Sequence, residues 1–142
     1  MPTNHEINKS ILRHILQNLQ ANRLLQDKRM QKAVQLLAQI SLAALILMIF
    51  VGGTEPVANG LFPPPLDKVV HSLVYGLMLL LAILSFPNTR KPILFILTVI
   101  IGTLDEIHQI YLPGRSAGLD DLLADIFGCI LISLILKYLD KK

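Results

Sequence analysis

The chain has little of the charge on which an ordinary soluble domain depends. Only 16% of its 142 residues are charged, whereas 53% are hydrophobic, and the mean hydropathy is +0.57. This balance argues against the usual soluble globular class and indicates a membrane protein. The single cysteine, Cys129, lies inside an apolar run, which excludes a disulfide framework and is typical of a small core residue.

Several common signatures of catalysis and binding are also missing. No serine or cysteine has an evident base beside it, which argues against triad-type nucleophilic catalysis. There is no Gly-rich phosphate loop and no internal repeat. The net charge of +3 comes from basic residues that flank apolar segments, so we expect contact with the lipid bilayer and no nucleic-acid partner. We predict no cofactor and no metal site.

Four apolar segments dominate the chain, at residues 33–51, 66–86, 92–112 and 119–139. Each is near the ~20 residues that a helix needs to cross ~30 Å of hydrocarbon. Breaks rich in glycine and proline separate them, including the run Pro63-Pro64-Pro65. The prediction is an all-α protein, a four-transmembrane-helix bundle with an N-terminal basic amphipathic interfacial helix.

That N-terminal helix is predicted over an arm, residues 1–32, which precedes the domain of residues 33–142. Apolar residues recur there at every fourth position, as Ile7, Ile11, Ile15 and Leu19. This is helical periodicity, and the other face is basic. A helix lying in the headgroup region explains both faces. A soluble hairpin arm or a dimer contact is the alternative.

The lysines and arginines predict how the chain crosses the membrane. They gather in the arm, in the connection at residues 87–91 and at the C-terminal end, and are scarce in the other two connections. Basic flanks stay on the cytoplasmic side. We therefore expect a multi-pass protein with both termini cytoplasmic.

Acidic residues and histidines inside the last three segments fall near one end of each, the end that this topology places outside. Asp67, His71 and Tyr75 are spaced four apart and share one helix face, as do Asp105 with Gln109. A carboxylate at the centre of a membrane helix costs about 2.5–3.5 kcal/mol, so such groups face a partner or a polar cavity. We expect one outward-opening pocket between these helices. The predicted binding residues are Asp67, Lys68, His71, Tyr75, Asp105, Glu106, Gln109, Arg115, Asp121 and Asp125.

Arg115 follows the turn Pro113-Gly114 and is the cation expected to hold the carboxylates, because its planar fork binds two at once. Lys68 is the second candidate. Asp120 is expected to face headgroups or to cap the fourth helix. His108 lies off the stripe of Asp105 and Gln109 and is expected to be peripheral.

Small residues recur where these helix stripes must approach one another. Ser72 with Gly76, and Ala124 with Gly128, are small residues four apart. Such pairs allow close helix contact in lipid. They predict that the polar stripes meet in one compact bundle.

Three runs resemble the VanZ-like family: D-K-V-V-H-S-L-V-Y at 67–75, G-T-L-D-E-I-H-Q at 102–109 and P-G-R-S-A-G-L-D-D-L-L-A-D-I-F-G at 113–128. The resemblance covers about residues 34–138 and leaves the arm outside. It implies a protein of the bacterial inner (cytoplasmic) membrane, associated with susceptibility to the glycopeptide teicoplanin. It also implies roles for the predicted binding residues other than Asp125, and for Gly128. The family commonly has asparagine at the position of Asp125.

The sequence leaves several functions open. The first is binding of a cell-envelope, lipid-linked or glycopeptide-related ligand in the pocket. The second is a membrane hydrolase or transferase that uses His71 with Asp105 or Glu106 as acid and base, with or without a divalent ion. The third is a structural ion-pair network alone, since buried pairs are often retained without catalysis. Ion movement is disfavoured, because the inner half of each helix lacks acidic residues and histidines that could relay a proton or an ion.

Overall fold

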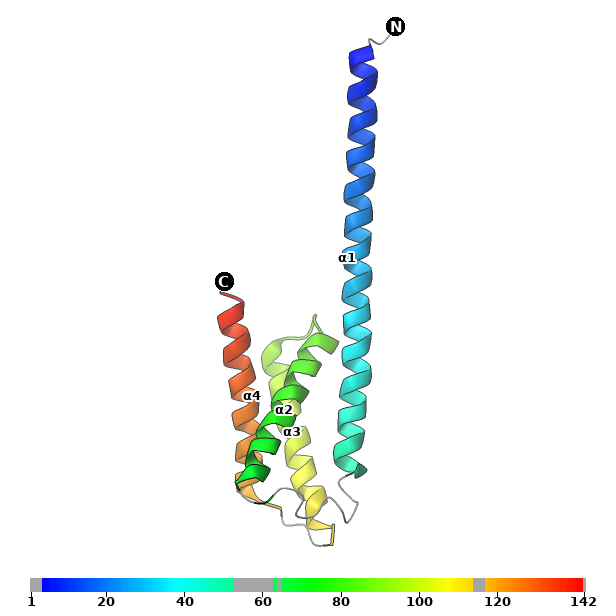
Figure 1. The fold of residues 1–142 in the computed structure, drawn as a ribbon. Helices are drawn as coiled ribbons and strands as arrows, with labels where there is room; N and C mark the ends of the chain where they lie inside the picture. Colours follow the sequence, from blue (N-terminus) through cyan, green and yellow to red (C-terminus); the bar gives the residue numbers. More distant parts are fainter. Residues whose placement is uncertain (1–3, 53–62, 64, 114–116, 142) are drawn as a thin grey trace. The chain divides into compact units, whose positions relative to one another are not determined.

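The computed structural model describes residues 4–52, 63, 65–113 and 117–141, with side chains from residue 26 onward. These residues form helices α1 (Asn4–Phe50), α2 (Leu66–Ser85), α3 (Lys91–Ile110) and α4 (Leu119–Leu139), without a strand among them (Figure 1). Each helix contains a stretch long and apolar enough to cross a membrane, which in α1 is Gln26–Phe50. The predicted all-α class with four spanning helices is confirmed.

The arm and the first span form one continuous helix of 47 residues. No glycine or proline occurs between Asn4 and Phe50, so no residue there breaks the backbone pattern. The chain divides into two compact units, residues 1–36 and residues 37–142. The second unit contains the end of α1 and all of α2, α3 and α4. The headgroup position of the arm stays a prediction.

Local sequence explains where the other three helices begin and end. Pro65 directly precedes α2, and Pro87 follows its end. In α3, Pro92 lies in the first turn, where its missing N–H removes no helical hydrogen bond. In α4, Asp120 and Asp121 occupy the first turn, where negative charge favours the helix dipole.

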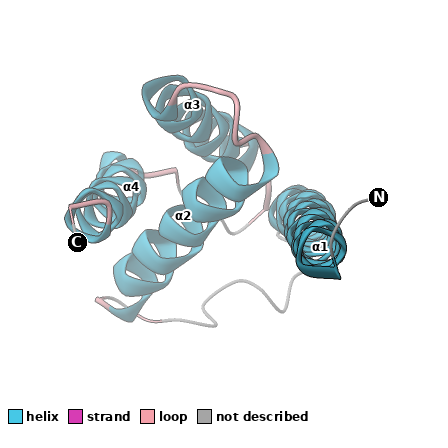
Figure 2. Cartoon of the chain, turned by 90° about the horizontal axis from the view of Figure 1, so that it is seen from above, coloured by secondary structure: helices cyan, strands magenta, loops and turns pink. Residues whose placement is uncertain are grey.

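Helices α2 and α4 are in close backbone contact at Gly128. A Cβ atom on Gly128 would fall on the backbone of Ser72, 2.9 Å from its Cα atom. On the other side of the contact, a Cβ atom on Gly76 would lie 3.1 Å from the carbonyl oxygen of Gly128. The Ser72 hydroxyl donates to the carbonyl oxygen of Ala124 at 2.9 Å. The small residues therefore allow the close contact that their spacing predicts, while α2 lies obliquely to its neighbours (Figure 2).

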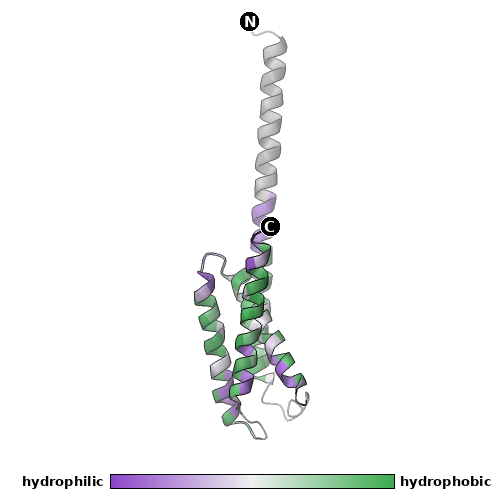
Figure 3. Ribbon diagram, turned by 90° about the vertical axis from the view of Figure 1, so that its left-hand side faces the viewer, coloured by the Kyte–Doolittle hydropathy of each residue, from purple (hydrophilic) through white to green (hydrophobic). Residues whose placement is uncertain are grey.

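The core of the second unit lies between the helices and is small. Tyr75, Met78, Leu79, Leu94 and Cys129 are its most deeply buried members. The position of Cys129 confirms the prediction of a core residue. Large apolar side chains are exposed along all four helices, as expected for surfaces that face lipid. Hydrophobic residues dominate the middle of α2, α3 and α4, and hydrophilic residues gather toward their ends (Figure 3).

Candidate functional site

Lys68 is the cation of a cluster that joins the first turns of α2 and α4. Its Nζ atom lies 2.5 Å from Asp121 Oδ1, 2.8 Å from Asp120 Oδ2 and 3.1 Å from Asp67 Oδ2. The Asp121 side chain is mostly buried, whereas that of Asp120 is largely exposed. The ammonium group of Lys68 therefore forms ion pairs with three carboxylates, one from α2 and two from α4.

His71 lies one turn further along α2 and pairs with α4. Its Nδ1 atom lies 2.9 Å from Asp125 Oδ1, and its Nε2 atom lies 3.8 Å from Asp121 Oδ1. Asp125 is fully buried, and its Oδ2 atom has no hydrogen-bond partner within the described ranges of the chain. A carboxylate that accepts at Nδ1 fixes the ring and directs Nε2 toward Asp121.

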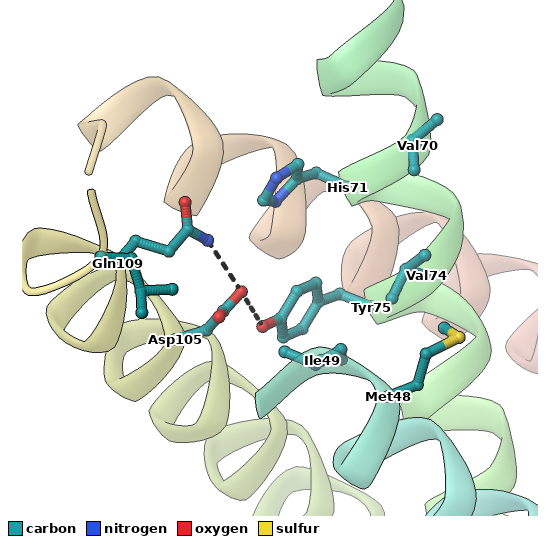
Figure 4. Close-up of a pocket in the computed structure, with 9 residues that line it drawn as sticks. Met48, Ile49, Val70, His71, Val74, Tyr75, Asp105 and Gln109 are labelled. Carbon is teal, nitrogen blue, oxygen red and sulfur yellow. Dashed lines mark hydrogen bonds between the residues drawn. The ribbon is translucent and has the colours of Figure 1, made fainter. Parts of the chain in front are cut away.

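Tyr75 connects α2 to α3 through Asp105. The Tyr75 hydroxyl donates to Asp105 Oδ2 at 3.1 Å, and the Gln109 amide donates to the same oxygen at 3.1 Å (Figure 4). All three residues are buried. Gly102 on α3 leaves space for the side chain of Asp125 from α4, because a Cβ atom on Gly102 would lie 2.9 Å from Asp125 Oδ2.

Glu106 connects the end of α3 to the start of α4. Its Oε2 atom accepts a hydrogen bond from the backbone N–H of Gly118, the residue before α4, at 2.8 Å. Its Oε1 atom is buried and has no hydrogen-bond partner in the part of the chain that the structure describes, and the residue as a whole is 8% exposed. Of the two oxygens of this buried carboxylate, Oε2 is therefore hydrogen-bonded, and Oε1 is not hydrogen-bonded to any described residue.

A cavity of about 140 Å³ opens beside these residues. Figure 4 shows His71 and Tyr75 on α2 and Asp105 and Gln109 on α3, which form its polar side. The rest of the lining is apolar and comes from Met48, Ile49, Val70, Val74 and Leu112. A lining of this kind accommodates a group that is polar on one side and apolar on the other.

Three residues of the site have the spacing of a metal-binding set. Ligand atoms of His71, Glu106 and Asp121 all lie within 4.8 Å of one another. These are one imidazole and two carboxylates, which together suit divalent transition ions.

The structure brings together nearly all of the predicted binding residues, from the three helices that the spacing indicated. Arg115 lies outside the described residues, and Lys68, the second candidate, is the cation of the cluster. The carboxylate in hydrogen-bond contact with His71 is Asp125, where the sequence had favoured Asp105 or Glu106. His108 lies against Phe50, with ring centroids 5.6 Å apart, in keeping with its expected peripheral place.

Sequence reasoning left Asp120 out of the site, although this residue pairs with Lys68. Its position one residue before Asp121 favoured a helix cap. The sequence nevertheless contained a signal for this pairing. Asp67-Lys68 and Asp120-Asp121 lie in the first turns of two helices that begin at the same end of the bundle, which places Lys68 near both aspartates of the second helix.

The fold and the site together define a multi-pass membrane protein with a buried cluster of ionisable groups at one end of its helices. The chain belongs to the VanZ/LLP1 family, whose model matches residues 5–140. The match includes most of the arm, so the expectation that the resemblance begins near residue 34 is wrong. No curated protein and no solved structure matches the chain.

Proposed function

We propose that the chain binds the polar part of a cell-envelope or lipid-linked molecule in the cavity, and that this binding alters susceptibility to the glycopeptide teicoplanin. The observation that carries the proposal is the convergence of buried Asp105, Glu106, Asp121 and Asp125 from two helices upon His71 and Tyr75 of a third. Groups that are so costly in a membrane are concentrated where they serve binding or chemistry.

The lining indicates the kind of group that is bound. Asp105 is the carboxylate of the described lining, its Oδ2 atom accepts from Tyr75 and Gln109, and the side chains of Gln109 and His71 offer further acceptor atoms. Acceptor-rich sites select hydrogen-bond donors such as sugar hydroxyls and amines. Met48, Ile49 and Val74 offer an apolar surface to an adjoining hydrocarbon part. Saccharide-bearing lipids combine these two features.

Family membership supports the choice of membrane, and the basic flanks of the helices support the orientation. We place the protein in the inner membrane of a bacterium, with both termini cytoplasmic, the cavity toward the outer face and the arm in the cytoplasmic headgroup region. In this orientation the ligand reaches the cavity from the outer leaflet, where cell-envelope precursors are used.

A susceptibility assay tests the proposal with one isosteric variant. In a bacterial host without this protein, expression of the wild type should raise the inhibitory concentration of teicoplanin. Asp105→Asn should return that concentration to the level of the host alone, because the cavity loses a charged acceptor. Asp140→Asn, which changes an exposed carboxylate at the opposite end of α4, should behave as the wild type. If Asp105→Asn is inserted at the wild-type level and keeps the full effect, the proposal is wrong.

A second candidate function is acid–base catalysis on the same ligand. It is favoured by the pairing of His71 with a fully buried carboxylate, an arrangement that fixes the ring for proton transfer. Incubation of the purified protein with lipid-linked saccharides, with and without a chelator, distinguishes binding from turnover. Bound but unchanged lipid supports the binding function, whereas product that disappears in His71→Gln supports the hydrolase or transferase.

A further inference from the structure

We propose that His71, Glu106 and Asp121 bind a divalent transition-metal ion, with Zn²⁺ as the reference ion. The inference deepens the proposed function, since the ion would lie at the same site, but the binding of metal is measured independently of any ligand. It starts from the geometry of these three residues, whose ligand atoms lie within 4.8 Å of one another.

The first argument is the orientation of the histidine. Histidines that bind metals usually donate their other ring N–H to a carboxylate, which fixes the tautomer. His71 has this arrangement, because its Nδ1 atom is 2.9 Å from Asp125 Oδ1. The lone pair of Nε2 is then available on the side of Asp121, whose Oδ1 atom is 3.8 Å away. Without a cation or a proton between them, these two acceptor atoms would repel each other.

The second argument is the free oxygen of Glu106. Its Oε1 atom is buried without a hydrogen-bond partner among the described residues, in a side chain whose residue is 8% exposed, while Oε2 accepts from Gly118. A buried acceptor left unpaired is costly, and more so when it is charged. A metal ion at the centre of the three residues would satisfy this oxygen.

The third argument is the charge of the site. Asp105, Glu106, Asp121 and Asp125 are all at most 9% exposed. Lys68 is the cation that contacts this group among the described residues, and it is also shared with Asp67 and Asp120. A divalent ion would offset the remaining negative charge.

The set of ligands indicates the class of ion. One imidazole with two carboxylates suits Zn²⁺ or Mn²⁺, whereas Mg²⁺ and Ca²⁺ favour sites made of oxygen alone. Ligand atoms about 2.0–2.2 Å from Zn²⁺ lie about 3.4 Å apart in tetrahedral geometry, so the three side chains would close by about 1 Å. Three protein ligands leave a fourth position open for water or for an oxygen of the bound molecule. At Asp121 the ion would replace the ammonium group of Lys68, which keeps its other two carboxylates.

Zinc titration of the purified full-length protein tests the proposal. The protein is prepared without a histidine tag, stripped with EDTA and titrated with Zn²⁺ by calorimetry. We expect one saturable site per chain. Glu106→Gln should weaken Zn²⁺ binding at least tenfold and Asp125→Asn about 10–100-fold, the usual effect of removing an orienting carboxylate. Asp140→Asn should not change the affinity.

Two further measurements keep the test decisive if a variant fails to fold. X-ray absorption of the zinc-loaded wild type should show one imidazole among oxygen ligands. Lys68→Met should bind Zn²⁺ more tightly than the wild type, because the competing ammonium is gone. The absence of a stoichiometric site in the wild type, or unchanged affinity in folded Glu106→Gln, would overturn the metal site. A protein that binds no Zn²⁺ but still binds lipid-linked saccharide leaves the proposed function intact.

Discussion

Lys68→Met is expected to destabilise the folded protein by about 2–3 kcal/mol, between the 0–1 kcal/mol typical of exposed pairs and the 3–5 kcal/mol typical of buried ones. The reason is that Lys68 is partly buried and contacts three carboxylates, of which Asp121 is mostly buried. Methionine keeps the apolar stem but leaves these negative charges facing one another. The free energy of unfolding in mixed micelles measures the effect.

Two variants control for this prediction. Lys91→Met breaks an ion pair of 2.6 Å with Asp140, in which both side chains are more than half exposed, and should cost at most about 1 kcal/mol. Asp121→Asn in the Lys68→Met background should recover part of the loss, because it removes one of the unpaired charges. Equal effects of Lys68→Met and Lys91→Met would show that the Lys68 cluster is merely a surface network.

Gly128→Ala should have an effect at least as large, about 3 kcal/mol or more, because overpacking that the structure cannot relieve exceeds the usual 1–3 kcal/mol. The added Cβ atom would meet the backbone of Ser72 rather than a flexible side chain, so α2 and α4 must separate. Separation also breaks the Ser72 hydrogen bond to Ala124 and moves His71 away from Asp125. The expected result is loss of both stability and binding, measured by unfolding and by Zn²⁺ titration.

Gly52→Ala is the matched control for this substitution. Among the described residues, the atom nearest to a Cβ atom on Gly52 is Met48 Cγ at 3.7 Å, so the same added methyl group should change stability little. If Gly128→Ala is as stable as Gly52→Ala, the close approach of α2 and α4 is incorrect.

The fold was predictable because hydropathy and breaker residues determine it almost alone. The observed bounds of α4, Leu119–Leu139, are those expected, and α2 and α3 differ from expectation by at most two residues at an end. Continuity of the arm with the first span was harder to predict. Composition changes near residue 32, but a change from polar to apolar sequence does not end a helix when no breaker is present.

The helix faces that contribute to the site were predictable from spacing, whereas the pairings between them, and the part of Asp120 in them, were not. Spacing of four residues shows which side chains share a face of one helix, as for Asp67, His71 and Tyr75. It does not show which faces of two helices contact each other, or which residues along the two helix axes lie opposite one another. The pairing of His71 with Asp125 depends on the close contact at Gly128, and the sequence indicates only that such a contact is allowed.

The most direct test of one shared polar site is zero-length cross-linking of the wild-type protein in membranes. A carbodiimide joins a lysine to a carboxylate only when the two are in contact. The account predicts a cross-linked peptide that joins Lys68 of α2 to Asp120 or Asp121 of α4, alongside the Lys91–Asp140 product as an internal control. Recovery of the control product without any link from Lys68 to α4 would contradict the account.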